Sequence, residues 1–244
     1  LEVLSNYFSE FALIKYRIFV EIQYFIALWE LEIPQLSKLS KNSVKNIEQI
    51  FLGFSIEDAM YIKEIEEKIN HDVKAVEYFI KDKFDELGLS KFKEFVHFGL
   101  TSQDINNTAI PLILKNFTTD YYLNKLFEVR NELQVLIEKC EGVSVLARTH
   151  GQPASPTKLD KEIKVFKVRI DEQIKILKNN LYASKFSGAT GNFNAHKVSY
   201  PNVDWETFGR NFCEKKLKLH YSFPTTQIEH YDHYAALCDS KSRI

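Results

Sequence analysis

Polar and glycine-rich clusters interrupt the sequence at five places and carry much of its titratable chemistry. Each cluster falls where a helix is predicted to end or where two helices are joined. Binding and catalytic groups often lie on such loops when a rigid scaffold positions them, so these are the candidate sites. The five clusters are Asn70–Asp72, His97–Asn107, Arg148–Lys158, Gly188–Asn194 and Thr225–Glu229.

His150 stands at a corner of the third cluster, within the run Thr149–Pro153. An imidazole titrates near neutrality, so it can give a proton to a leaving group at physiological pH. Taken alone, His150 fits a hydrogen-bonded structural histidine better than a functional one, and the same holds for His71 and His97. No closely spaced histidine or cysteine accompanies any of the three, so neither a zinc site nor a cofactor is predicted.

Thr101 and Ser102 precede a predicted long helix. Hydroxyl side chains at that position cap a helix N-terminus. The free N–H groups and the positive end of the helix dipole also attract an anion, so the same pair is a candidate carboxylate site. Asp72 is, by the same logic, a candidate N-cap for a helix that starts at Val73.

Helices are the elements that must position these clusters. Apolar residues recur at spacings of three and four from Phe11 to Leu31, which predicts one helix face. A capping box at Ser55 predicts another helix, and Gly88 is a plausible end for a third. The predicted helices cover residues 11–31, 55–69, 73–87, 102–140, 156–182, 202–217 and 228 onward, with a short strand at Val143–Leu146.

Composition is that of an ordinary globular protein. The 244 residues are 45% hydrophobic and 27% charged, with a net charge of −1, so nucleic-acid binding has no electrostatic footprint. Three well-separated cysteines are typical of reduced thiols in the cytoplasm, where we expect the protein to act. No transmembrane helix or signal peptide is expected, so no membrane partner is predicted.

The predicted fold class is mainly α. Short helices come first and long helices follow, which suits a small helical domain joined to a helix bundle. We expect an N-terminal domain of short helices over residues 1–92 and a second region of long helices over residues 93–244. The boundary is placed in the loop from Leu87 to Lys93.

Five runs of this sequence resemble, in order and in spacing, the successive motifs of the adenylosuccinate lyases. One such motif is a weak signal, whereas five in order are a strong one. The resemblance extends over essentially the whole chain. The runs are Asn70–Phe79, Thr101–Asn107, Arg148–Ala154, Gly191–His196 and Thr225–Glu229.

The resemblance implies a fold and a reaction. The family belongs to the fumarase/aspartase superfamily, whose long-helix domains form a homotetrameric core. The resemblance implies that residues 1–92 are the N-terminal helical domain and that residues 93–244 are the first part of the central long-helix bundle. It cleaves a carbon–nitrogen bond by β-elimination and releases fumarate, so that adenylosuccinate gives AMP and SAICAR gives AICAR. The expected partner is therefore a small purine nucleotide, in purine biosynthesis, and no cofactor is implied.

The resemblance also implies roles for single residues. His150 occupies the position of the general acid. His71 would support catalysis as well as bind substrate, and His97 and Thr149 would act in support. The implied substrate-binding residues are Asn70, His71, Asp72, Thr101, Ser102 and Gln227.

Two parts of the family pattern are missing from this sequence. The loop S-S-x-M-P-x-K-x-N-P, which carries the serine base, would lie beyond Ile244, and a D-G-R-Y stretch would precede Leu1. We therefore name no base, expect the chain to be part of a longer one, and expect these 244 residues alone to be inactive. Pro111, inside a predicted helix, and His230 are smaller departures.

Two other functions remain open at this point. One is another lyase of the superfamily, such as argininosuccinate lyase, or a cycloisomerase; the run Asn70–Phe79 argues against it. The other is a non-catalytic helical module that serves in assembly.

Overall fold

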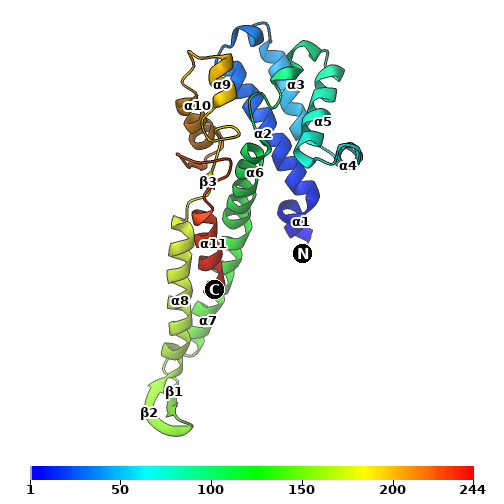
Figure 1. The fold of residues 1–244 in the computed structure, drawn as a ribbon. Helices are drawn as coiled ribbons and strands as arrows, with labels where there is room; N and C mark the ends of the chain where they lie inside the picture. Colours follow the sequence, from blue (N-terminus) through cyan, green and yellow to red (C-terminus); the bar gives the residue numbers. More distant parts are fainter. Residues whose placement is uncertain (1) are drawn as a thin grey trace. The chain divides into compact units, whose positions relative to one another are not determined.

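A computed structural model describes residues 2–244, and Figure 1 shows the order of its elements. Helices dominate, so the prediction of a mainly α fold is confirmed. The α-helices are α1 Glu2–Phe8, α2 Glu10–Glu30, α3 Lys41–Leu52, α4 Ile56–Ile69, α5 Asp72–Glu86, α6 Ser102–Asn116, α7 Leu123–Lys139, α8 Leu159–Asn179, α9 Asn194–Ser199, α10 Trp205–Asn211 and α11 Asp232–Ser242. Short 3₁₀ segments are η1 Pro34–Leu36 and η2 Ser90–Phe95; π-helical segments are η3 Phe117–Tyr122 and η4 Phe212–Lys216.

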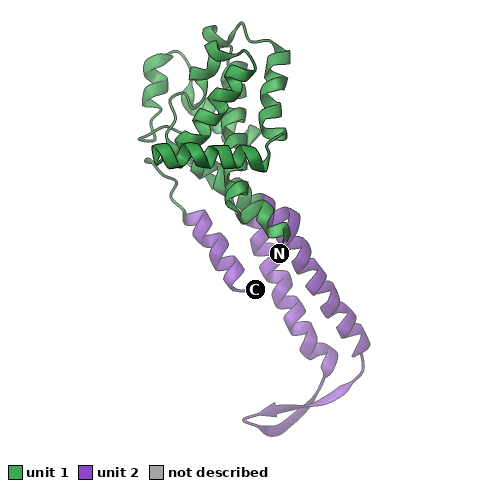
Figure 2. Cartoon of the chain, turned by 90° about the vertical axis from the view of Figure 1, so that its right-hand side faces the viewer, with its two compact units in different colours: residues 1–115, 181–231 green, residues 116–180, 232–244 purple. Residues whose placement is uncertain are grey.

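The chain forms two compact units, coloured separately in Figure 2. Unit 1 consists of residues 1–115 and 181–231, and unit 2 consists of residues 116–180 and 232–244. The predicted boundary between residues 92 and 93 lies inside unit 1. As a division of the whole protein into domains, that boundary stays a prediction.

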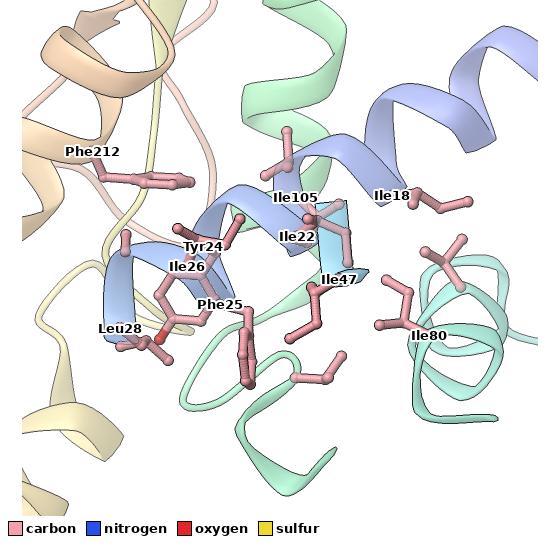
Figure 3. Close-up of a cluster of buried hydrophobic side chains, with 14 of the residues drawn as sticks. Ile18, Ile22, Tyr24, Phe25, Ile26, Leu28, Ile47, Ile80, Ile105 and Phe212 are labelled. Carbon is pink, nitrogen blue, oxygen red and sulfur yellow. The ribbon is translucent and has the colours of Figure 1, made fainter. Parts of the chain in front are cut away.

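Unit 1 is built around α2, which is buried along most of its length. The side chain of Ser9 accepts the N–H of Ala12 and caps the start of this helix. Isoleucines and aromatic side chains of α2 then pack against α3, α5, α6 and η4, as Figure 3 shows. Each large side chain buried there stabilises the fold by about 1.5–3 kcal/mol.

Unit 2 contains a helical pair, α7 and α8, joined by a two-stranded hairpin. Strands β1 (Ser144–Thr149) and β2 (Gln152–Lys158) pair antiparallel, and a register irregularity lies between Leu146 and Arg148. The predicted strand near residue 145 is present. In unit 1, β3 (Ala183–Ser184) and β4 (His220–Tyr221) make a short parallel pair.

The prediction that a helix begins at Pro156 is wrong. Pro156 lies in β2, opposite Leu146, and α8 begins only at Leu159. A proline lacks a backbone N–H, so it is tolerated in a two-stranded ribbon, where one edge of each strand is unpaired. The sequence signal of a proline at a first helical turn fits this edge strand equally well.

The other predicted helices lie close to their predicted places, whereas α1, α3 and α9 were not predicted. The capping box of α4 is present, since Ser55 and Asp58 accept each other's backbone N–H. Gly88 follows α5 with φ +69°, as a C-terminal glycine should. The predicted helix over residues 102–140 is α6, η3 and α7, and α6 continues through Pro111. Between residues 2 and 244, no helix combines the length and apolarity needed to cross a membrane.

Candidate active site

Asn70 and His71 form the turn between α4 and α5 in unit 1. Asn70 ends α4 with φ +53°, a left-handed conformation that asparagine tolerates better than most residues. His71 is the N-cap of α5, because its Nδ1 accepts the backbone N–H of Lys74 at 3.1 Å. The prediction that Asp72 is the N-cap is therefore wrong. Asp72 is the first residue of the helix, and its Oδ1 accepts the N–H of Val73 at 2.8 Å.

A buried arginine joins this turn to α6. Arg17 of α2 is only 7% exposed, and its guanidinium contacts Asp72 Oδ2 at 2.6 Å and Asn106 Oδ1 at 3.0 Å. Burial raises the pKa of Asp72, but the Arg17 charge and the Val73 N–H outweigh it and hold that pKa below its ordinary value. Sequence reasoning missed Arg17, whose only signal is a charge inside a largely apolar helix.

The start of α6 lies beside the start of α5. Ser102 Oγ is 3.4 Å from His71 Nε2, so the structure brings two predicted site residues together. Thr101 precedes the helix, and its backbone N–H donates to Asp104 Oδ2 at 2.9 Å. Both Thr101 and Ser102 are half-buried, at the end of the helix where the dipole favours an anion.

Asp104 is the centre of a buried polar network that sequence reasoning also missed. Its carboxylate contacts Lys185 Nζ at 2.6 Å, and both side chains are fully buried. It also accepts the backbone N–H groups of Ser187 and Gly188. Burial lowers the pKa of Lys185, and the charge of Asp104 opposes that shift. One side chain thus ties the start of α6 to the cluster at Gly188.

The cluster at Thr225 joins the same block. Ser187 Oγ is 3.1 Å from Thr225 Oγ1, and a Cβ added to Gly191 would lie 2.1 Å from the Thr225 carbonyl oxygen. One turn after Asp104, Asn107 Oδ1 accepts the N–H of Glu229 at 2.9 Å. The second, fourth and fifth clusters therefore meet in unit 1. Gln227 lies on this last loop, and its side chain is exposed.

His97 lies in the turn before α6 with φ +58°. Its Nδ1 is 2.5 Å from Oε1 of Glu21, a carboxylate buried in α2. Burial lowers the pKa of His97, but Glu21 and then Glu77 raise it more, so the pKa lies above its ordinary value. The turn beside α6 therefore favours a positively charged imidazolium.

His150 belongs to unit 2, at the tip of the β1–β2 hairpin. His150 and Gly151 are the two residues of the turn, with φ +49° and +77°. Positive φ at both positions is the requirement of a type I′ hairpin turn. Thr149 ends β1 opposite Gln152, and the His150 side chain is exposed. The predicted corner is present, whereas the acid role of His150 stays a prediction.

His196, from the fourth motif, is a core residue. Its Nε2 is 3.0 Å from the hydroxyl of Tyr24, which donates to the carbonyl oxygen of Phe98 at 2.6 Å. Burial lowers the pKa of His196 to about 4, so the ring is neutral at physiological pH. Among the described residues, 2–244, no three His, Cys, Asp or Glu side chains gather closely enough to hold a metal ion.

Comparisons with known proteins show which family the chain resembles. The family model described as "Lyase" matches residues 4–244. Adenylosuccinate lyase of Dictyostelium discoideum is 49% identical over 253 residues, covering 100% of this chain and 54% of that protein. Adenylosuccinate lyase of Vibrio cholerae is 40% identical over 243 residues, covering 99% of this chain and 53% of that protein.

Solved structures show the same fold. The fumarate lyase of Mesorhizobium sp. BNC1 superposes with a TM-score of 0.76 at 18% identity, over 99% of this chain and 53% of that one. The β-carboxy-cis,cis-muconate cycloisomerase of Acinetobacter calcoaceticus gives a TM-score of 0.74 at 17% identity, over 100% of this chain and 54% of that one. The chain spans about half the length of the curated relatives it matches. Because the family model covers nearly all of its residues, the chain belongs to the lyase family, within the fumarase/aspartase superfamily.

Proposed function

We propose that this chain is part of an adenylosuccinate lyase, which eliminates fumarate from adenylosuccinate to give AMP and from SAICAR to give AICAR. The observation that carries the proposal is identity of 37–49% to curated adenylosuccinate lyases along the chain. The clustering of Asn70–Asp72 with the start of α6 supports it, since these are the stretches implied to bind substrate.

The reaction needs groups that stabilise a developing negative charge. A base takes a proton beside a carboxylate of the succinyl group, and charge builds on that carboxylate as the C–N bond weakens. The N–H groups at the start of α6 and the hydroxyls of Thr101 and Ser102 are donors suited to that anion. His97, paired with the buried carboxylate of Glu21, lies in the turn that precedes this helix.

The reaction also needs an acid at the departing nitrogen. We assign that role to His150, with Thr149 in support, since an imidazole can protonate the nitrogen near neutral pH. The hairpin turn presents the ring to solvent instead of burying it. The substrate-binding residues of the proposal are Asn70, His71, Asp72, Thr101, Ser102 and Gln227, with His97 in support.

Assembly and location belong to the same proposal. We place the protein in the cytoplasm as a homo-oligomer, and as a tetramer by analogy with the family. The three cysteines, Cys140, Cys213 and Cys238, are far apart in the sequence, which is typical of reduced thiols and supports a reducing compartment. The domain boundary between residues 92 and 93 is part of this proposal as well.

A substrate panel tests the function. The product of the complete gene is incubated with adenylosuccinate, SAICAR, argininosuccinate and a carboxymuconate, and fumarate is measured with the second product. We expect fumarate only from the two purine substrates, in equal amount to AMP or AICAR. Cleavage of argininosuccinate or conversion of the carboxymuconate would point to another member of the superfamily. No turnover of any substrate would favour a non-catalytic assembly role.

A further inference from the structure

We propose that His71 is held as the neutral tautomer with its hydrogen on Nε2, and that it positions the Ser102 hydroxyl for the substrate instead of transferring a proton. The role toward the substrate rests on the proposed function. The tautomer rests on contacts within unit 1 alone, so the two parts can fail separately.

The cap of α5 fixes one side of the ring. His71 Nδ1 accepts the backbone N–H of Lys74 at 3.1 Å. That N–H is one of the first four of the helix, which have no acceptor within the helix. A ring nitrogen accepts a hydrogen bond only when it carries no hydrogen. The hydrogen of the neutral ring is therefore on Nε2.

The same cap opposes the doubly protonated ring. A hydrogen on Nδ1 would point at the Lys74 N–H and break the cap. Asp72 Oδ1 is the nearest carboxylate oxygen, 3.7 Å from Nδ1. However, that oxygen already accepts the Val73 N–H, and the other oxygen is paired with Arg17 at 2.6 Å. Both carboxylate oxygens therefore have other donors, and the Lys74 N–H is the hydrogen-bond partner of His71 Nδ1.

The other side of the ring faces the start of α6. With its hydrogen on Nε2, His71 donates to Ser102 Oγ at 3.4 Å. The hydroxyl of Ser102 then has its own hydrogen free to donate to a carboxylate. The bond is long, as hydrogen bonds of unliganded sites often are before substrate tightens them. His71 is therefore a positioning residue, and proton transfer is left to His150.

Nuclear magnetic resonance reads the tautomer directly. The chain is labelled with ¹⁵N in its seven histidines, and long-range ¹H–¹⁵N spectra are recorded near pH 7. Loss of one set of signals in His71→Asn assigns the ring. We expect an unprotonated Nδ1 and a protonated Nε2. Ser102→Ala should move the Nε2 signal and leave Nδ1 in place. A protonated Nδ1, in either the other tautomer or the imidazolium, would overturn the proposal.

Two matched variants test the contacts of the two ring nitrogens of His71 separately. His71→Asn keeps a strong N-cap acceptor but has no group at the Nε2 position. His71→Gln places an amide N–H near that position but loses the cap. We expect His71→Gln to lower Tm by about 2–4 °C and His71→Asn to leave it unchanged. An equal fall in both variants would show that the Nδ1 cap is not made.

Activity of the complete gene product tests the role toward the substrate. His71→Asn should raise KM for adenylosuccinate about tenfold, and His71→Gln should recover much of that loss. Equal loss of kcat in both variants with KM unchanged would show proton transfer by His71 and contradict the positioning role. If the wild-type protein does not cleave adenylosuccinate, the proposed function fails, while the spectra and Tm values still decide the tautomer.

Discussion

At the scale of single residues, two buried charges organise unit 1 around α6. Arg17 joins the start of α5 to Asn106, and Asp104 joins the start of α6 to the loop at Gly188. Charged groups are buried only when they are paired, because leaving water is costly. Arg17 lies outside the five sequence motifs, and the motif that contains Asp104 does not indicate its contacts with Lys185 and Gly188. Their pairing is set by tertiary contacts between segments 55–89 residues apart.

The Asp104–Lys185 pair makes the first prediction. Asp104→Asn keeps the size of the side chain but leaves the fully buried ammonium of Lys185 without a counter-charge. We expect the free energy of unfolding to fall by about 3–5 kcal/mol, measured by urea denaturation. The double variant Asp104→Asn, Lys185→Met is the control and should recover part of the loss. A loss below about 1 kcal/mol in the single variant would contradict the pairing.

His196 makes a prediction about pH. Burial lowers its pKa to about 4, whereas an unfolded histidine titrates near its ordinary 6.5. The contribution of the neutral ring to the free energy of unfolding is therefore complete above pH 6.5 and is lost as the pH falls from 6.5 to 4. This contribution is about 3 kcal/mol in total. His97 has the opposite pH dependence. Because its pKa is raised, its contribution to the free energy of unfolding is lost as the pH rises through that raised pKa.

The matched variant for this prediction is His196→Leu. Tyr24 still donates to the Phe98 carbonyl there, so the variant mainly removes the titrating ring. Urea denaturation at several pH values should show the wild-type stability falling towards that of the variant between pH 6.5 and 4. If the two stability curves stay parallel over this range, His196 is not the group that titrates.

At the scale of elements, close backbone approach fixes two loops to each other. Gly191 has φ +81°, and a Cβ there would lie 2.1 Å from the Thr225 carbonyl oxygen. Gly88 also has a left-handed φ, +69°, but nothing lies within 4 Å of its missing Cβ. A side chain at Gly88 would therefore cost only the free energy of a left-handed backbone, whereas a side chain at Gly191 would add a clash with the Thr225 loop.

Replacing each of the two glycines by alanine tests this difference in the cost of a side chain. Gly88→Ala should lose about 1–2 kcal/mol, the cost of a left-handed residue with a side chain. Gly191→Ala should lose at least twice as much, because backbone atoms of the Thr225 loop must move as well. Thermal and urea unfolding of both variants measure the two losses. Equal losses would show that the loops do not approach as closely as the structure places them.

The elements themselves were largely predictable from the sequence. The capping box at Ser55 and the glycine after α5 are local signals, and both mark the ends that they predict. The prediction failed at Pro156, where a proline suits an edge strand as well as a first helical turn. It also missed that an imidazole, and not the Asp72 carboxylate, caps α5. Local sequence does not say which of two adjacent acceptors reaches the free N–H groups.

The sequence predicted the polar clusters of the candidate site, but it did not predict the contacts that join them. The clusters at His71, Ser102 and Thr225 were each visible as polar interruptions. The packing that joins them depends on the buried charges of Arg17 and Asp104. Arg17 lies outside the five clusters, and Asp104 lies within one of them without any local sign of its distant partners.

At the scale of the whole molecule, unit 2 exposes large apolar side chains on both of its long helices. Phe166 is 57% exposed and Val168 48% exposed on α8, and Val129 is 50% exposed on α7. Soluble proteins usually cover apolar groups gathered on long helices with a partner. The apolar exposure fits the proposed homo-oligomer, in which copies of the chain cover these faces.

Self-association tests this reading. We expect sedimentation velocity of the purified chain to show oligomers whose population rises with concentration. Phe166→Ser with Val168→Ser should weaken association at least tenfold. Val198→Ser is the control, since Val198 is 84% exposed on the short helix α9 and belongs to unit 1. A monomer at every concentration, or equal weakening by the control, would contradict this role of the unit 2 helices.

Release of fumarate from adenylosuccinate tests the central proposal most directly. The complete gene product is compared with its His150→Gln variant, with AMP and fumarate measured together. We predict equal amounts of AMP and fumarate from the wild type and a kcat at least about 100-fold lower in the variant, because it cannot protonate the leaving nitrogen. Absence of fumarate from the wild type, or a variant as fast as the wild type, would contradict the account.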